Sequence, residues 1–319
     1  MEKNDKVFIA GSTNMIGCAL IRELARQGYS NVMGESREMP DFLNAGRVDT
    51  FFSRVRPDYV FLVAGRSGGI SANQRYPADL IFDNLMTECH VINSAYRHGV
   101  QKLLYLASSC SYPRLCPQPM KEEYLLTGPL EPTNEAYAVA KIAGIKLCES
   151  YRQQFGADFI TGIPANIFGL GDDFSMEDSH VIAALIRKMH EAKTHLKSCV
   201  DIWGTGKPVR EFIFADDLAD ACIFVMNRYS SLAPVNLGSG CAVTMEELAL
   251  SIKEITQYEG GLYFDITKPD GMPVKILDSG KLRELDWQPR FSFPEALRMS
   301  YQWYLDEVAE NREILRIRE

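Results

Sequence analysis

The stretch that decides the fold lies at the start of the chain. It runs from Lys6-Val-Phe-Ile-Ala10 through the turn Gly11-Ser-Thr-Asn14-Met-Ile-Gly17 into Met15–Gln27, whose apolar residues have helical spacing. A buried strand, a glycine-containing turn and a helix in this order are typical of the unit that holds the pyrophosphate of a dinucleotide. The helix N-terminus supplies free N–H groups and a positive dipole end. Asn14 replaces the usual middle glycine, and asparagine caps helices well; on this motif alone, an ordinary strand–helix loop is the alternative.

Strand-like and helix-like segments alternate through the rest of the first half. Apolar runs of strand length lie at Asp58–Ala64, Lys102–Ala107 and Phe159–Ile163, and segments of helical length and pattern lie at Leu80–Arg97 and Glu135–Gln154. Near-continuous apolar strands separated by helices predict a parallel sheet that is covered on both faces. We therefore expect an α/β protein with a Rossmann-type doubly wound parallel sheet.

The regular alternation weakens after Pro164. Further elements are expected as helices at Val181–Ala192, Asp216–Asn227, Thr244–Thr256 and Pro294–Val308, and as a strand at Ala233–Leu237. We expect residues 1–165, rejoined by about residues 214–242, to form the dinucleotide-binding domain. Residues 166–213 and 243–319 are expected to form a smaller C-terminal α/β domain, with a site between the two.

Composition and charge exclude several classes of function. The chain has 319 residues, with 34 Lys and Arg against 42 Asp and Glu, so its formal net charge is −8 and a nucleic-acid partner is disfavoured. No stretch approaches the roughly 18–20 apolar residues that a membrane helix needs, and the first residues do not resemble a signal peptide. The 8 cysteines are scattered without the spacing of metal ligands. These features predict a cytoplasmic protein with reduced thiols, no metal and no membrane partner.

A tyrosine and a lysine share one face of an expected helix. In Tyr137-Ala-Val-Ala-Lys141 the two residues stand one turn apart. A lysine beside a tyrosine favours the phenolate, and such a tyrosine can protonate a carbonyl oxygen while a nicotinamide supplies hydride. The strand Lys102–Ala107 ends in Ser108, whose hydroxyl can bond the same oxygen. Without Ser108 and the glycine turn, a surface tyrosine with a solvated lysine would be the simpler interpretation.

The choice of cofactor depends on the residues after the second strand. An acidic residue there accepts the ribose hydroxyl of NAD, whereas an arginine holds the 2′-phosphate of NADP. The local sequence is Gly34-Glu-Ser-Arg-Glu38. Ser36 and Arg37 favour NADP, whereas Glu35 and Glu38 would repel a phosphate. The sequence therefore favours NADP and leaves NAD open.

Segments from one end of the chain to the other resemble a known family. The turn, Ser108 and the Tyr137–Lys141 pair occur in the order of the extended short-chain dehydrogenase/reductases that act on sugar nucleotides. Within these, the chain is similar to the GDP-L-fucose synthase family. The similarity is carried by Gly68-Gly-Ile, Asn73, Tyr76-Pro-Ala-Asp79, Ser108-Ser-Cys-Ser-Tyr-Pro113, Gln118-Pro-Met120, Leu130-Glu-Pro-Thr-Asn-Glu135, Lys141–Tyr151, Ser179-His-Val-Ile182, Trp203-Gly, Arg210-Glu-Phe212 and Lys268-Pro-Asp-Gly271.

The resemblance implies two reactions in one site. These are epimerisation of GDP-4-keto-6-deoxy-D-mannose at C3 and C5, and then reduction of its C4 ketone by NADPH to give GDP-L-fucose. Ser108, Tyr137 and Lys141 match the reductive triad, and Cys110 and His180 match the pair that epimerises. The residue types fit, because a tuned thiolate and an imidazole both exchange protons near neutral pH. Read alone, Cys110 would be a buried apolar filler and His180 a capping or solvated residue.

The resemblance also implies cofactor-binding and substrate-binding positions. The expected cofactor residues are Gly11, Ser12, Thr13, Asn14, Met15, Ile16, Gly17, Arg37, Leu106, Ala107, Lys141, Pro164, Asn166, Ile167 and His180. The expected substrate residues are Lys188, Trp203, Arg210 and Asp270. Thr13 and Lys188 stand where some family members carry arginine.

The family resemblance implies a homodimer, packed through the helices Leu80–Arg97 and Glu135–Gln154. Two other functions remain open from the sequence. One is epimerisation and reduction of a related GDP-4-keto sugar, of the colitose type or a 6-deoxyheptose. The other is a non-catalytic NADP-sensing protein, which would usually have lost the tyrosine or the lysine of the pair.

Overall fold

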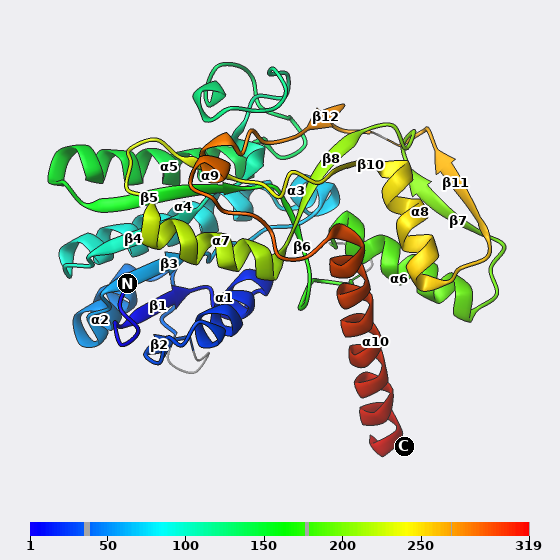
Figure 1. The fold of residues 1–319 in the computed structure, drawn as a ribbon, viewed down its shortest axis with the longest axis horizontal. Coiled ribbons are helices and arrows are strands. Elements are labelled where there is room, and N and C mark those ends of the chain that lie inside the picture. The colour runs from blue at the N-terminus through cyan, green and yellow to red at the C-terminus, as the bar shows by residue number, and fades with distance from the viewer. Residues whose placement is uncertain (35–38, 176–178, 269, 319) are drawn as a thin grey trace.

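The computed structural model describes residues 1–34, 39–175, 179–268 and 270–318, with only the backbone described from residue 309 onward. The chain forms a large sheet flanked by helices, at the left of Figure 1, and a smaller group of strands and helices at the right. We call these the large lobe and the small lobe. No helix within the described ranges is long and apolar enough to cross a membrane.

Six parallel strands make the sheet of the large lobe. They are β1 (Val7–Ala10), β2 (Val32–Met33), β3 (Tyr59–Leu62), β4 (Lys102–Leu106), β5 (Asp158–Pro164) and β9 (Val235–Leu237). Their order across the sheet is β2-β1-β3-β4-β5-β9, and every neighbouring pair is parallel. The predicted doubly wound parallel sheet is confirmed. The chain reverses its direction of winding between β1 and β3, which is where ligands bind in such sheets.

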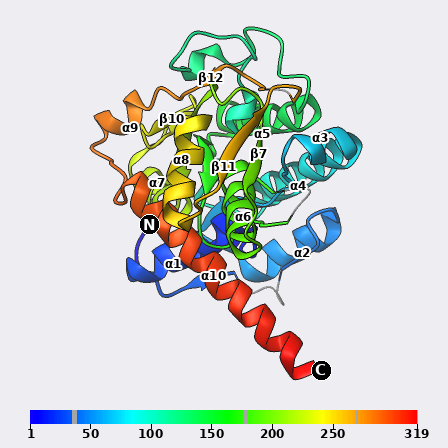
Figure 2. The ribbon, with the colours of Figure 1, turned by 90° about the vertical axis from the view of Figure 1, so that its right-hand side faces the viewer.

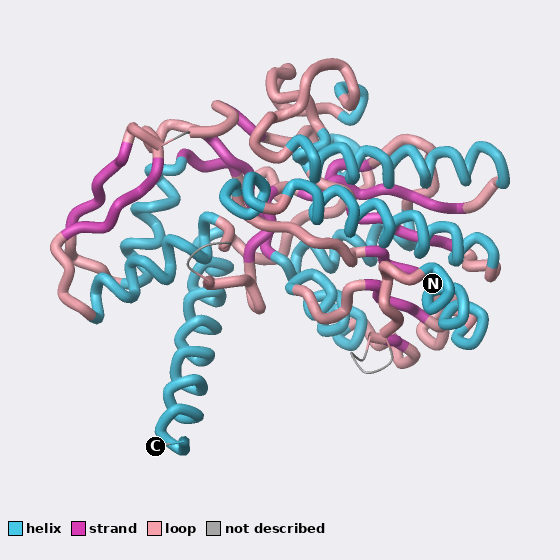
Figure 3. The backbone as a smooth tube through the Cα atoms, turned by 180° about the vertical axis from the view of Figure 1, so that it is seen from behind, coloured by secondary structure: helices cyan, strands magenta, loops and turns pink. Residues whose placement is uncertain are grey.

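Helices cover both faces of this sheet (Figures 2 and 3). One face carries α2 (Ala45–Val55), α4 (Pro77–Arg97) and α5 (Glu135–Phe155), and the other carries α1 (Met15–Arg26) and α7 (Ala215–Arg228). The double covering explains why all five residues of β4 are buried and why those after Lys102 are apolar or aromatic. The remaining short elements of this lobe are α3 (Ile70–Arg75), α9 (Gly280–Glu284) and the 3₁₀ turns η2 (Ser109–Ser111) and η3 (Glu122–Tyr124).

The small lobe is built around β8 (Val209–Phe214). This strand pairs with β6 (Asn166–Phe168), β10 (Ala242–Thr244) and β12 (Val274–Lys275), while β7 (Cys199–Trp203) pairs with β11 (Gly261–Asp265). The helices are α6 (Val181–Thr194), α8 (Met245–Thr256) and α10 (Phe293–Arg318). Phe168, Phe212 and Phe293 stack edge-on or face-on at ring distances of 5.6–6.3 Å in its core.

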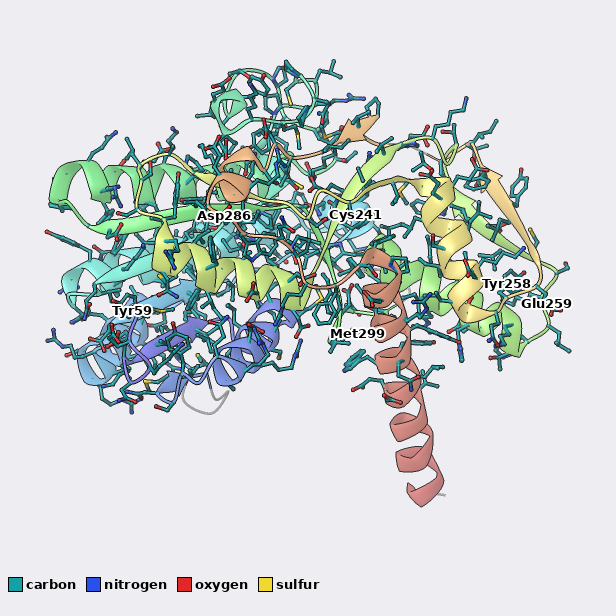
Figure 4. The ribbon with its side chains drawn as sticks, in the orientation of Figure 1. Tyr59, Cys241, Tyr258, Glu259, Asp286 and Met299 are labelled. Carbon is teal, nitrogen blue, oxygen red and sulfur yellow. The ribbon has the colours of Figure 1, made fainter. Side chains whose placement is uncertain are left out.

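The two lobes meet where the chain passes from one to the other. β5 ends at Pro164 and β6 begins at Asn166, so the carboxyl ends of the large sheet face the small lobe. In Figure 4, Cys241 lies between the two lobes, whereas Tyr59 and Tyr258 lie at opposite ends of the molecule. The site expected between the lobes therefore has strand ends on one side and β8 on the other.

The long elements expected from the sequence are present, with ends shifted by no more than three residues, except at the C-terminus. There the expected end at Val308 is wrong, because α10 continues to Arg318 and extends away from the rest of the molecule (Figure 2). The sequence missed α2 and the short strands β6–β8 and β10–β12. These strands are two to six residues long and are defined by distant partners, which gives little local signal.

Candidate active site

The turn between β1 and α1 has the tight shape that a pyrophosphate needs. Gly11 has a φ of +102°, and a Cβ there would lie 2.5 Å from the backbone nitrogen of Ala64. A Cβ on Gly17 would overlap the carbonyl oxygen of Gly11. Asn14 caps α1: its Oδ1 accepts from the N–H of Gly17 at 2.8 Å, and its Nδ2 donates to the carbonyl of Val63 at 2.8 Å. Asparagine therefore fixes this turn to the end of β3, a role that glycine cannot perform.

A buried ion pair holds Lys141 in the large lobe. Its Nζ lies 3.1 Å from Oε1 of Glu88 on the neighbouring helix α4, and both side chains are buried. The hydroxyl of Tyr105, on β4, donates to the same Oε1 at 2.7 Å. Burial lowers the pKa of Lys141, but the charges of Glu88 and Tyr137 outweigh it, so the pKa is raised overall. The lysine therefore stays an ammonium in an apolar setting.

Tyr137 stands one turn before Lys141 on α5, as predicted. The Nζ of Lys141 lies 5.8 Å from the centre of the Tyr137 ring. The pKa of Tyr137 is raised overall, mainly because the side chain is buried. The charge of Lys141 and a hydrogen bond with Ser108 oppose the rise, whereas Cys110 and Glu88 add to it. Ser108 lies two residues after β4, and its hydroxyl accepts from the N–H of Cys110 at 3.2 Å. The structure thus brings the tyrosine, the lysine, the serine and the cysteine together.

Two side-chain donors surround the sulfur of Cys110. Nδ2 of Asn134, the residue before α5, lies 3.2 Å from Sγ, and Nζ of Lys275 on β12 lies 3.5 Å away. Burial lowers the pKa of the Arg210 guanidinium, and the charges of Asp270 and then Cys110 oppose this effect. The sulfur therefore lies at the junction of the two lobes, among donors from both.

His180 is the N-terminal cap residue of α6 and is partly buried. Burial lowers its pKa, Asp173 opposes this effect, and Lys275 adds to it. Lys275 is thus close enough to act on both Cys110 and His180. An imidazole in this setting favours its neutral form.

Comparison with known proteins agrees with this arrangement. The model of the NAD dependent epimerase/dehydratase family matches residues 7–238. GDP-L-fucose synthase 1 of Arabidopsis thaliana is 50% identical over 96% of this chain and 95% of its own length. The chain belongs to the GDP-L-fucose synthases of this family.

Two solved structures support the fold of this GDP-L-fucose synthase relative. A GDP-6-OMe-4-keto-L-xylo-heptose reductase from C. jejuni superposes with a TM-score of 0.90 at 34% identity, covering 96% of this chain and 99% of that one. A GDP-L-fucose synthetase from Naegleria fowleri, bound to NADP, superposes with a TM-score of 0.88 at 26% identity, covering 97% and 96%.

The residues of the expected cofactor site fit a dinucleotide of the NAD(P) type. The glycine cradle leaves room that any side chain would fill, and the hydroxyl of Ser12 is buried without a partner among the described residues. Thr13, Met15 and Ile16 complete the turn. The other expected residues lie where β4 and β5 end and β6 begins: Leu106 ends β4 and Ala107 follows it, Pro164 ends β5, and Asn166 and Ile167 begin β6. Arg37 lies outside the described residues.

Three of the four expected substrate residues gather in the small lobe. Asp270 accepts from the backbone and hydroxyl of Thr205, at 2.7 and 2.9 Å, in the loop that follows Trp203. Arg210 donates to the carbonyl of Asp270 at 3.2 Å. Trp203 is 53% exposed and carries the ammonium of Lys268 at 5.4 Å from its ring centre. These contacts place an aromatic surface and a guanidinium along one edge.

Lys188 contacts the strand that carries Trp203. It is exposed on α6, and its Nζ donates to the carbonyl of Asp201 on β7 at 3.4 Å.

The sequence interpretation missed Glu88, Asn134 and Lys275. Glu88 had a detectable signal, because it is an acidic residue on the otherwise uncharged inward face of α4. Asn134 stood inside a quoted motif but carried no assigned role. Lys275 had no sequence signal, since only the pairing of β12 with β8 brings it to the site.

Proposed function

We propose that this protein converts GDP-4-keto-6-deoxy-D-mannose into GDP-L-fucose, with NADPH as the hydride donor. The observation that carries the proposal is the grouping of Ser108, Cys110 and Tyr137. The backbone of Cys110 is bonded to the hydroxyl of Ser108, and Tyr137 interacts with both residues. A ketone bound by the serine and tyrosine hydroxyls would therefore have its neighbouring ring carbons close to the thiol.

Epimerisation follows from the acidity of the ring hydrogens next to the ketone. A base removes a proton from C3 or C5, the C–H electron pair passes to the ketone oxygen, and an acid on the opposite face returns a proton. Cys110 and His180 are proposed for these two roles. The hydroxyls of Ser108 and Tyr137 donate to the oxygen as it gains negative charge, which lowers the barrier.

Reduction uses the same oxygen. Tyr137 delivers the proton that this oxygen needs, and Lys141 stabilises the phenolate that remains. NADPH, held by Gly11–Gly17 and the strand-end residues Leu106, Ala107, Pro164, Asn166 and Ile167, supplies the hydride when it is bound. Lys141 and His180 are also proposed to contact this cofactor.

The GDP group is proposed to lie against the small lobe. Arg210 and Lys188 supply positive charge for its two phosphates. Trp203 offers an apolar wall, and Asp270 is the acceptor for ribose hydroxyls, with its carboxylate already held by Thr205. In this arrangement the large lobe, residues 1–165 with about 214–242, binds the cofactor. Residues 166–213 and 243–319 bind the sugar nucleotide, apart from α9, which packs against β9 of the large lobe.

The preference for NADP over NAD is part of the proposal. The sequence Ser36-Arg37 after the second strand supports it, because an arginine at this point of the chain is the residue type that holds a 2′-phosphate. Thr13 in place of arginine leaves fewer cations for the 2′-phosphate, so the preference is expected to rest on Arg37. Fluorescence titration of the protein with NADPH and NADH measures it, and equal affinities would contradict it.

We propose that the protein is a homodimer joined through α4 and α5. These helices expose Phe82, Val139 and Phe155 by 57%, 40% and 45%. Large apolar side chains on adjacent helices favour a helical interface between two copies. Sedimentation equilibrium is expected to give twice the mass of the chain, and Phe82→Glu is expected to give monomers.

The reaction is tested by incubating the purified protein with NADPH and GDP-4-keto-6-deoxy-D-mannose. NADPH oxidation together with GDP-L-fucose, identified by NMR, is the expected result. Reduction without inversion at C3 and C5 would rule out the epimerase roles of Cys110 and His180. No oxidation of NADPH with any GDP-4-keto sugar would favour the NADP-sensing protein instead.

A related GDP-4-keto sugar is the second candidate substrate. The similarity to a heptose reductase at a TM-score of 0.90 favours it. Parallel assays with a 3,6-dideoxy sugar of the colitose type and with a 6-deoxyheptose decide between the candidates. The substrate with the highest kcat/KM is the physiological one under this proposal.

A further inference from the structure

Lys275 has an unusual partner for a lysine. Its Nζ lies 3.5 Å from the sulfur of Cys110, and the side chain is only partly exposed. Among the described residues, no carboxylate forms an ion pair with it. Lys141, the other lysine of the site, is by contrast paired with Glu88. The ammonium of Lys275 is therefore directed at the sulfur of Cys110 rather than at a carboxylate.

The backbone around Lys275 fixes its position. β12 pairs with β8 in parallel register, so Lys275 stands directly beside Arg210 and the two side chains share a face of the sheet. The next residues are bonded to the loop that follows Cys110. The N–H of Met120 donates to the carbonyl of Ile276 at 2.7 Å, and the N–H of Asp278 donates to the carbonyl of Met120 at 2.8 Å. The backbone that follows Lys275 is thus bonded to the loop after Cys110, while β8 holds Lys275 beside Arg210.

We propose that Lys275 stabilises the anionic sulfur of Cys110 during epimerisation. This inference rests on the proposed function. If Cys110 is the base, the sulfur begins as a thiolate and gains the ring proton; if it is the acid, it begins as a thiol and is left as a thiolate. In both cases the C–H electron pair passes to the ketone oxygen and returns when the second proton arrives. The sulfur carries negative charge at one end of each transfer, and the ammonium of Lys275 lies against it.

Asn134 is the matching neutral donor. Its Nδ2 lies 3.2 Å from the sulfur, and its Oδ1 is buried without a partner among the described residues. An amide with one end unsatisfied is costly unless the other end is used, and an anionic sulfur is a stronger acceptor than a thiol. Asn134 and Lys275 together therefore provide two hydrogen-bond donors for the thiolate.

Other charged and titratable groups also face this pair. Arg210 on β8 and Tyr137 on α5 both interact electrostatically with Cys110, and Glu131 acts on Arg210. The pKa of His180, at the start of α6, is lowered by burial and by Lys275 and raised by Asp173. Removal of the lysine charge is therefore expected to make His180 easier to protonate and to leave the sulfur of Cys110 with one donor fewer.

The test measures the reactivity of Cys110 without substrate or cofactor. The full-length protein is treated with iodoacetamide between about pH 6 and pH 9, and alkylation of Cys110 is followed by peptide mass spectrometry. Lys275→Met is expected to slow alkylation near neutral pH by about 10- to 100-fold, because it removes a charge-assisted hydrogen bond. Lys275→Arg is expected to restore most of the rate. Lys197→Met, which removes an exposed lysine between α6 and β7, is the charge-matched control.

An unchanged pH profile in Lys275→Met, or an equal change in Lys197→Met, would overturn the proposal. Lys275→Gln, which keeps an amide donor without the charge, replaces the methionine variant if that variant does not fold. Deuterium incorporation from solvent into the keto sugar is measured separately and is expected to fall about 10-fold or more in Lys275→Met. If the wild-type protein incorporates no deuterium, the proposed reaction fails while the alkylation result still decides the role of Lys275 at the thiol.

Discussion

The reductive groups and the epimerising groups of this site are built in different ways. Tyr137 and Lys141 lie one turn apart on α5, and Glu88 reaches Lys141 from the adjacent helix α4. Cys110, His180 and Lys275 come from three separate segments: the turn after β4, the start of α6 and strand β12. The first group is fixed by helix geometry and burial. The second is fixed only when the two lobes are folded against each other.

This difference predicts that changes in the two groups affect folding stability and catalytic activity to different extents. The reductive side contains a buried ion pair, so a change there is expected to affect folding as well as activity. The epimerising side is held by backbone hydrogen bonds between loops, so its side chains can be changed with less effect on folding. The predictions below test this contrast.

The largest effect is expected from the two acid–base residues themselves. Tyr137→Phe should lower NADPH oxidation by about 10²- to 10⁴-fold, because the ketone oxygen loses its proton donor. Solvent deuterium should still enter the keto sugar in this variant. Cys110→Ser should give the opposite result, with little deuterium exchange. NMR of the sugar ring measures deuterium exchange, and a parallel absorbance assay measures NADPH oxidation. Equal loss of both activities in each variant would contradict a separation between reductive and epimerising residues.

The next effect concerns the free energy of unfolding. Glu88→Leu leaves the Lys141 ammonium buried without a carboxylate, and about 3–5 kcal/mol should be lost in urea denaturation. Glu88→Leu with Lys141→Met removes both charges and should recover most of this loss. Glu149→Gln, which breaks an exposed pair with Lys146, should cost less than about 1 kcal/mol. A double variant no more stable than Glu88→Leu would show that the charge pair is not the cause.

A smaller effect is expected at Gly144, one turn beyond Lys141 on α5. A Cβ there would lie 2.5 Å from the hydroxyl oxygen of Tyr105 and 2.7 Å from Oε2 of Glu88. Gly144→Ala should therefore destabilise the protein by about 1–3 kcal/mol despite the better helix propensity of alanine. Tyr105→Phe removes the hydroxyl oxygen but keeps Cζ, which would also lie 2.5 Å from the Cβ, so it should relieve only part of this cost, as measured by urea denaturation of the single and double variants.

The smallest effect is a pH dependence on the epimerising side. Asp172 lies in the loop that leads towards His180, and burial raises its pKa to about 7, with the N–H of Asp173 opposing this. Between about pH 4 and pH 7 the folded chain keeps a proton that the unfolded chain has lost, so stability falls as pH rises. Asp172→Asn should lose less stability between pH 5 and pH 8, by on the order of 1 kcal/mol. Asp306→Asn, on the exposed side of α10, should leave the wild-type slope unchanged.

Much of the large lobe could be predicted from local pattern. The strand of Lys102–Leu106 is apolar or aromatic after its first residue, and α5 carries Tyr137 and Lys141 at the spacing of one turn. Each of these patterns is contained within a few neighbouring residues. The same holds for the turn of Gly11–Gly17, where the capping role of Asn14 follows from the residue type.

The small lobe could not be predicted in the same way. β12 has only two residues, and it exists because Val274 and Lys275 find partners on β8. The contacts of Asp270 with Thr205 and of Lys275 with Cys110 join segments far apart in the chain. The local sequence pattern does not predict such long-range contacts.

The sequence by itself determined the fold class, the cofactor turn and the candidates Ser108, Cys110, Tyr137 and Lys141. The tertiary structure alone decided that Glu88 balances Lys141 and that Lys275 and Asn134 meet the sulfur of Cys110. The physical reason is the range of the interactions. Helix and strand patterns depend on residues that are neighbours in the sequence. The partner of a buried charge or a thiol depends instead on which distant segments lie together in the folded chain.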